Sequence, residues 1–163
     1  MTTTAYTTEE LSKLAGAVMF TGMAVAIVDA GLVSTAIEAN AMAKEVAGAS
    51  QKYPTNTIIQ SLFSEEAAKE AKEHGKVKVE INPEEMKPDT AIDTAIAKIN
   101  EALTILEGKA TAEEIQQYKD FIYTCADRVA NAAGSGLFGS GSPKVSNTEA
   151  AALTKLKTAL ALQ

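Results

Sequence analysis

Aromatic residues are scarce in this sequence, which narrows the choice of fold. Tryptophan is absent and aromatic residues make up 5% of the 163 residues. Because β-sandwiches draw heavily on aromatic and β-branched side chains, the composition favours an aliphatic, alanine-rich core of closely packed helices. The length suits one domain with a core large enough to need no metal or disulfide. We therefore expect a single all-α domain over residues 1–163.

Residue types that commonly act in catalysis, metal binding or nucleic-acid binding are also rare or unclustered. The one cysteine, Cys125, excludes an internal disulfide and fits a reducing cytoplasm. The one histidine, His74, cannot supply the two Glu-x-x-His motifs of a di-metal bundle, and we expect it at a helix C-terminus. No basic run accompanies the net charge of -6, which argues against a nucleic-acid partner. We assign no catalytic residue and no cofactor, and we expect a protein that is not an enzyme.

The longest apolar stretch, residues 11–28, is expected to be the central helix. Between Leu14 and Val28 it has no polar face, and a helix that is apolar all round is buried by its neighbours. Gly22 and Ala26 form a ridge of small residues that should let the backbone of another helix come close. We expect five to seven helices, packed as a bundle or orthogonal array around this segment.

The same stretch could be taken for a membrane or targeting segment. Its apolar part, residues 14–28, is shorter than the ~20 residues that span a bilayer. The preceding residues carry Glu9 and Glu10 before the first lysine, whereas a signal peptide has a positive leading region. We therefore expect a cytoplasmic protein and keep membrane association through residues 14–28 as an alternative reading.

Capping signals predict where the other helices begin. A Ser or Thr followed three residues later by Glu forms a capping box that satisfies free backbone N–H groups. Residues 1–6, before the first box, are expected to be frayed. Helices should end at Gly108, in the C′ position, and at Gly134. Three such boxes occur: Thr7 with Glu10, Thr111 with Glu114, and Ser146 with Glu149.

The regions between these helices are less regular. Around Asp29 the chain could form one kinked helix or two consecutive helices over residues 11–49, and both arrangements fit the pattern. Thr55 or Asn56 should cap a short helix, followed by a solvated helix that ends before Gly75. We expect residues 73–89 to be a flexible connector, because the alternating run 77–81 has no second strand to pair with. Within it, residues 82–85 could form one helical turn.

Asp29 and Glu38 are the candidate metal or partner-binding acids. Asp29 interrupts the most apolar segment, where an isolated buried carboxylate would be costly. We favour a capping role for Asp29, with ion binding together with Glu38 as the alternative. Gly134, Gly136 and Gly139 match the dinucleotide pattern GxGxxG. They follow a helix rather than a strand, which favours a helix C-cap and a tight loop.

Two stretches share a plan of an alanine-rich helix, a glycine turn and a Val-Ser that opens a helix containing Glu. They read AVAIVDAGLVSTAIEA at residues 24–39 and VANAAGSGLFGSGSPKVSNTEAAALTKL at residues 129–156. This plan resembles the doubled helix-loop-helix of tellurite-resistance-associated TerB-like domains. The second stretch is also similar to the ends of small bacterial helical proteins. Both resemblances imply a bacterial all-helical protein, and the TerB-like one implies a link to stress.

These observations favour a non-enzymatic interaction or scaffold protein. The first alternative is a helical bundle that binds a small molecule or metal, because Gly22, Ala26 and the glycine loop leave room between helices. We also expect a homodimer or another protein partner. Helix 34–49 and the last helix carry apolar stripes, and surplus apolar area usually marks a contact surface.

Overall fold

The computed structural model describes residues 5–28, 35–74, 79–134 and 145–163, and within them it contains α-helices and no strand. The all-α prediction is confirmed. The described helices are α1 (Thr8–Ile27), α2 (Thr35–Lys52), α3 (Thr57–Phe63), α4 (Glu65–His74), α5 (Ala91–Leu106), α6 (Ala112–Gly134) and α7 (Asn147–Ala159), with a short 3₁₀ turn, η1 (Pro83–Glu85), before α5. Of the two arrangements that the sequence allows for residues 11–49, one kinked helix or two consecutive helices, the structure has two, α1 and α2.

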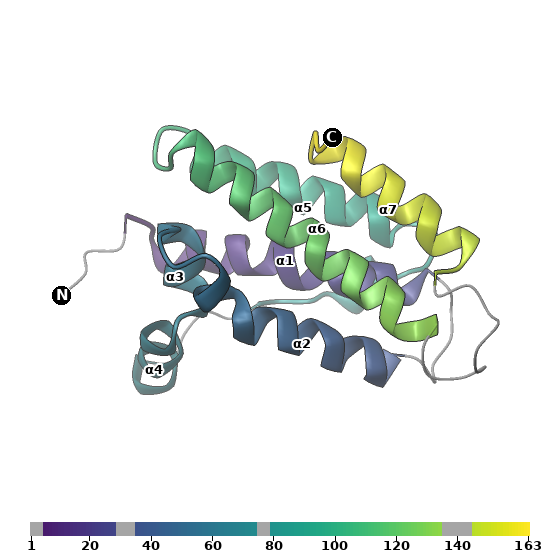
Figure 1. The fold of residues 1–163 in the computed structure, drawn as a ribbon, viewed down its shortest axis with the longest axis horizontal. Helices are drawn as coiled ribbons and strands as arrows, with labels where there is room; N and C mark the ends of the chain where they lie inside the picture. The colour runs from purple at the N-terminus through teal and green to yellow at the C-terminus, as the bar shows by residue number, and fades with distance from the viewer. Residues whose placement is uncertain (1–4, 29–34, 75–78, 135–144) are drawn as a thin grey trace.

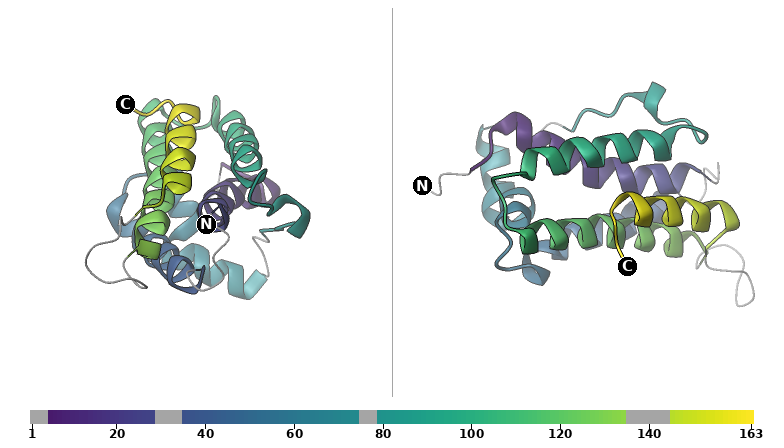
Figure 2. Two further views of the ribbon diagram at one scale, coloured as in Figure 1. Left: turned by 90° about the vertical axis from the view of Figure 1, so that its right-hand side faces the viewer. Right: turned by 90° about the horizontal axis from the view of Figure 1, so that it is seen from above.

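Helix α1 lies at the centre of the bundle, as its composition predicts. It packs mainly against α5 and α6, while α2 runs along α6 and closes another side (Figure 1). The view along the bundle shows α1 surrounded by α5, by α6 with α7, and by α2 (Figure 2). Ten residues of α1 are buried: Leu14, Ala15, Ala17, Val18, Phe20, Thr21, Gly22, Ala24, Val25 and Ala26.

Burial of α1 is not complete, because Met19 and Met23 remain half-exposed. By length and composition α1 is also the one described helix that could cross a membrane, and 56% of its most apolar window is buried inside the fold. That burial is accounted for by the packing of α1 within the bundle.

The capping signals place the helix starts correctly. All three predicted boxes form, with the N3 backbone N–H donating to the hydroxyl at 3.1–3.2 Å. Asn56 caps α3 by accepting from the N–H of Ile59 at 3.0 Å. Gly108 follows α5 with a positive φ of 75°, a conformation that glycine adopts without the steric cost of a Cβ.

The structure corrects the prediction of a frayed segment over residues 1–6 and describes only part of the predicted connector 73–89. Tyr6 belongs to the core and is only 5% exposed, so the frayed segment predicted over residues 1–6 does not extend to it. An apolar residue just before an N-cap commonly packs back onto its helix, and Tyr6 stands in that position, directly before Thr7. Within the predicted connector 73–89, residues 82–85 do form a turn that contains η1, and residues 75–78 lie outside the described residues.

The apolar stripes on α2 and α7 are used inside the chain. On α2, Met42 and Ala49 are buried, and on α7 Leu153 and Leu156 are buried. Among the described residues Ile37 is the one large hydrophobic side chain that is exposed. Part of the apolar area on which the expected homodimer was argued is therefore buried within the chain, and the homodimer stays a prediction.

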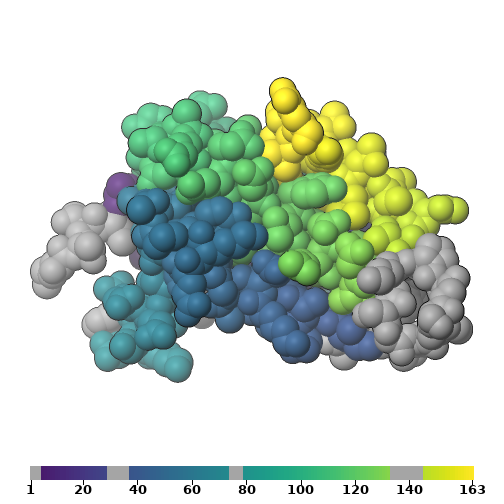
Figure 3. Space-filling model, in the orientation of Figure 1, coloured from purple at the N-terminus to yellow at the C-terminus, as the bar shows by residue number. Residues whose placement is uncertain are grey.

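In the space-filling view α2, α3, α6 and α7 form one continuous face, and α4 projects from it at the lower left (Figure 3). All but one of the described side chains of α4 are exposed, as expected for a solvated helix. The exception, Ala67, is half-buried, and α4 packs chiefly against α3. His74 is the last residue of α4, at the predicted helix C-terminus.

Glu114 joins the start of α6 to the start of α3. Its carboxylate accepts from the backbone N–H and hydroxyl of Thr57 at 3.0 and 2.6 Å, and from the same two groups of Thr111 at 2.9 and 3.1 Å. Desolvation raises the pKa of Glu114, but the hydrogen bonds from Thr57 and Thr111 together outweigh it and lower the pKa from 4.5 to about 2. The carboxylate is therefore a clamp that works in its ionised form.

We expect Glu114→Gln to lower the melting temperature at pH 7, by an amount equivalent to roughly 1 kcal/mol, the usual contribution of a cap. Because the folded-state pKa is depressed, the stabilisation by Glu114 is complete above about pH 4.5 and is lost as the pH falls towards 2. Thermal unfolding followed between pH 6 and 3 should therefore show a shallower pH dependence in Glu114→Gln. The control is Glu113→Gln in the same helical turn, and equal pH dependence in the two variants would contradict the clamp.

Candidate functional site

A predominantly apolar opening lies between α1 and α2, on the side of the ridge formed by Gly22 and Ala26. It has a volume of about 550 Å³ and is bounded further by α3, α4 and the segment after η1. We call it the methionine pocket. Its described lining residues are Met19, Gly22, Met23, Ala26, Ile27, Glu38, Ala39, Met42, Ala43, Val46, Ala47, Leu62, Phe63, Ser64, Ala68, Met86 and Val129.

Four of the five methionines of the sequence line this pocket. Met19 and Met23 stand one turn apart on α1, Met42 comes from α2, and Met86 follows η1. The fifth, Met1, lies outside the described residues. Methionine has a long unbranched side chain and a polarisable sulfur, which let it adapt to ligands of irregular shape. Such a concentration makes the pocket more than a packing defect.

Small side chains shape the rest of the lining. On α2, Ala39, Ala43 and Ala47 recur every four residues, line the pocket and are exposed, so the pocket opens to solvent along this helix. Ala68 of α4 lines it from the far wall and is also exposed. Eight residues of α2 separate Ala39 from Ala47, which corresponds to about 12 Å of helix.

The ridge predicted at Gly22 and Ala26 does admit a close neighbour at Gly22. A Cβ built on Gly22 would overlap the sulfur of Met42 and lie 2.9 Å from its Cε. The atoms nearest to such a Cβ belong to the thioether side chain of Met42 on α2 rather than to a helix backbone. Met42 therefore packs against Gly22 and forms part of the pocket wall.

Glu38 is the one predicted metal or partner-binding acid that lies within the described residues. It is 1% exposed, stands in the first turn of α2 and lines the methionine pocket. Asp29, Gly136 and Gly139 lie outside the described residues, and Gly134 is the last residue of α6. No group of three or more His, Cys, Asp or Glu side chains that could hold a metal ion occurs within the described part of the chain. Its described residues therefore do not bring together a set of ligands for the metal alternative.

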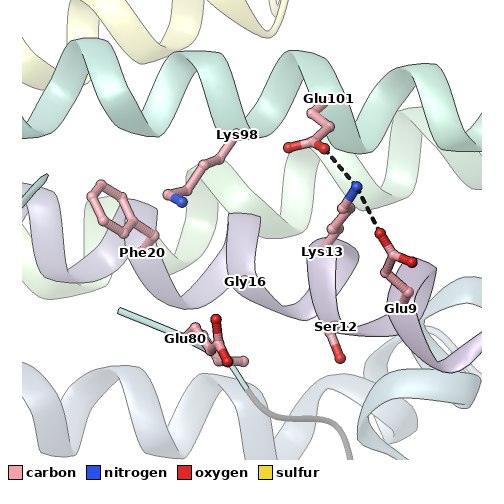
Figure 4. Close-up of a pocket in the computed structure, with 9 residues that line it drawn as sticks. Glu9, Ser12, Lys13, Gly16, Phe20, Glu80, Lys98 and Glu101 are labelled. Atoms are coloured by element: carbon pink, nitrogen blue, oxygen red, sulfur yellow. Dashed lines mark ion pairs between the residues drawn. The ribbon is translucent and has the colours of Figure 1, made fainter. Parts of the chain in front are cut away.

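A second pocket, of about 420 Å³, lies beside α1 and α5 and is lined largely by charged residues (Figure 4). Lys13 bridges Glu101 at 2.9 Å and Glu9 at 3.2 Å, and hydrogen bonding to Glu101 and then Glu9 raises the pKa of Lys13. Lys98 pairs with Glu85 at 3.2 Å and stands 5.0 Å from the centre of the Phe20 ring. Both lysines among the described lining residues have partners within the chain, so the described part of the pocket is a solvated ion-pair network.

Cys125 is buried among apolar neighbours of α6 and does not line the methionine pocket. Burial, with a smaller contribution from Glu45, raises the pKa of its thiol to about 12. The thiol is therefore protonated at neutral pH, which confirms the prediction of a small buried hydrophobic side chain over a reactive nucleophile.

Comparison with protein-family models, curated proteins and solved structures finds no match to this chain. The resemblance to TerB-like domains accordingly stays a prediction. The methionine pocket, defined by its own residues, is the candidate functional site.

The packing of Gly22 against Met42 can be tested by substitution. Gly22→Leu should lower the free energy of unfolding by about 1–3 kcal/mol, because leucine requires the space that Met42 occupies. Adding Met42→Ala frees that space, so the double variant should lose less stability than the sum of the two single losses. Denaturant unfolding of the three variants measures this coupling.

The matched control for this cycle is Gly48→Leu, in the interior of α2. A Cβ at Gly48 meets no atom of the described residues within 4 Å, so leucine should raise stability by roughly 0.5–1 kcal/mol through helix propensity alone. A raised melting temperature for Gly22→Leu, or strictly additive losses in the double variant, would refute the contact between α1 and Met42.

Proposed function

We propose that this protein is a non-enzymatic binding protein that holds a small apolar molecule in the methionine pocket. The observation that carries the proposal is the convergence of four methionines from three parts of the chain on one opening between α1 and α2. This is the small-molecule alternative from the sequence, and the geometry supports it better than a general scaffold role.

The dimensions of the pocket support this proposal. Sites for small molecules usually enclose about 300–1,000 Å³ and are lined mainly by apolar side chains with a few polar groups. The methionine pocket has a volume of about 550 Å³, and its described lining contains two polar residues, Glu38 and Ser64. Both features fit a site that gains its affinity from burial of apolar ligand surface.

The character of the lining favours binding over catalysis. Catalysis by general acids and bases requires titratable groups held within hydrogen-bond distance of reacting atoms. The described walls consist chiefly of hydrocarbon and thioether groups, and Cys125 faces elsewhere in the core. Such walls exclude water from the ligand and match its shape, but they supply no reacting group. The ligand should therefore leave the pocket without having been chemically changed.

The proposal predicts saturable binding of N-phenyl-1-naphthylamine, an uncharged apolar dye whose fluorescence rises in apolar surroundings. Ala43→Phe should weaken this binding at least tenfold, because a phenyl ring would fill the pocket from its α2 wall. The control is Ala151→Phe, at an equally exposed alanine of α7 that does not line the pocket. It should leave the affinity unchanged.

Both variants should keep the helical circular dichroism of the parent protein, since both positions are exposed. Dye titrations that show no saturation, or equal affinities for the parent protein and Ala43→Phe, would disprove binding in the methionine pocket.

A further inference from the structure

We infer that the methionine pocket is a site of reversible oxidation, at which a peroxide converts Met19, Met23 and Met86 to sulfoxides and the pocket then releases its apolar ligand. This inference rests on the proposed function and adds a mode of regulation for the same site. It follows from the exposure of these three thioethers, from the burial of the only thiol, and from the apolar character of the pocket walls.

Three of the four pocket methionines are accessible to a small oxidant. Met19, Met23 and Met86 line the pocket and are half-exposed. Met42 is 4% exposed, and its sulfur lies beside Gly22. An oxidant must reach the sulfur atom, so methionines in contact with solvent react before a buried one. Met42 should therefore be the last of the four to react.

The single thiol of the chain, Cys125, does not compete for the oxidant. It is 0% exposed, and burial raises the pKa of its thiol to about 12. The reactive form of a cysteine is the thiolate, which such a pKa suppresses near neutral pH. A thioether has no proton to lose, so its reactivity needs no ionisation. Among the described sulfur atoms, those of the three half-exposed methionines are the ones that a peroxide meets first.

The reaction with hydrogen peroxide is a transfer of one oxygen atom. The sulfur lone pair bonds to one peroxide oxygen while the O–O bond breaks, and the departing hydroxide takes the proton of the transferred oxygen and leaves as water. The sulfur loses two electrons, and the peroxide gains them. The sulfoxide that forms is polar, and methionine sulfoxide reductases return it to the thioether.

Oxidation changes the pocket walls in a way that opposes binding of an apolar ligand. A sulfoxide oxygen that faces the ligand loses its hydrogen bonds to water, which costs free energy. A sulfoxide that turns towards solvent withdraws its side chain from the wall, and the ligand loses the contacts it made there. Met42 keeps its thioether and its contact with Gly22, so we expect the packing of α1 against α2 to remain.

The test treats the parent protein with hydrogen peroxide, which catalase then removes. Peptide mapping by mass spectrometry locates each sulfoxide, and titration with N-phenyl-1-naphthylamine measures the affinity. We expect Met19, Met23 and Met86 to be oxidised before Met42 and Cys125, and the affinity to fall at least tenfold. Methionine sulfoxide reductases for both epimers should restore the affinity to within about twofold, whereas dithiothreitol alone should not.

Two variants assign the effect to these side chains. In the triple variant Met19→Leu, Met23→Leu and Met86→Leu, the ratio of the affinities before and after peroxide should stay within about twofold, whatever its starting affinity. Leucine is apolar and is not oxidised by peroxide. The matched control is Cys125→Ala, which removes the thiol outside the pocket. It should lose affinity after peroxide as the parent protein does.

The outcomes separate the two proposals. Absence of saturable dye binding by the untreated parent protein would overturn the proposed function, and the regulation with it. Binding that survives complete oxidation of the three methionines would overturn only the regulation. Earlier oxidation of Met42 or Cys125, loss of helical circular dichroism on oxidation, or an equal loss of affinity in the triple variant would do the same. If the triple variant does not fold, restoration of the parent protein by the reductases decides.

Discussion

The constraint on which the structure depends is the burial of α1. From Leu14 onward α1 has no polar face, and such a segment is buried by its neighbours, so α5, α6 and α2 cover it from different sides. Close approach on the α2 side requires small residues, and Gly22 provides the space that the side chain of Met42 occupies. The contact is made by a flexible thioether, and beyond it the two helices leave a pocket of about 550 Å³. The same small residues thus serve the packing of the bundle and the opening of its pocket.

Much of the fold follows from local signals in the sequence. The capping boxes at Thr7, Thr111 and Ser146 place three helix starts because they satisfy backbone N–H groups through residues only three positions apart. On α6 the buried residues Tyr118, Ile122, Cys125 and Val129 recur at helical spacing, so the sequence pattern marks this buried face. The burial of Tyr6 differs from the frayed segment predicted over residues 1–6, although its place just before the N-cap Thr7 is a local signal for packing onto the helix.

The candidate site could be predicted only in part. Gly22 and Ala26 indicate a close helix neighbour, and Glu38 is a carboxylate within an apolar pattern, so both are visible in the sequence. Met19 and Met23 also share a face by their spacing. That Met42 and Met86 meet them cannot be read from the sequence, because this depends on how α2 and the segment after η1 cross α1. Such convergence is a tertiary property, and here it separates a binding pocket from ordinary core methionines.

The central claim is that an apolar ligand occupies the space among these four methionines. The most direct measurement is a titration of protein labelled with ¹³C at the methionine methyl groups, followed by two-dimensional NMR spectroscopy with N-phenyl-1-naphthylamine. The account predicts saturable shifts of the resonances of Met19, Met23, Met42 and Met86, with a common dissociation constant. Methyl resonances of the four pocket methionines that stay unchanged at saturating dye would contradict it.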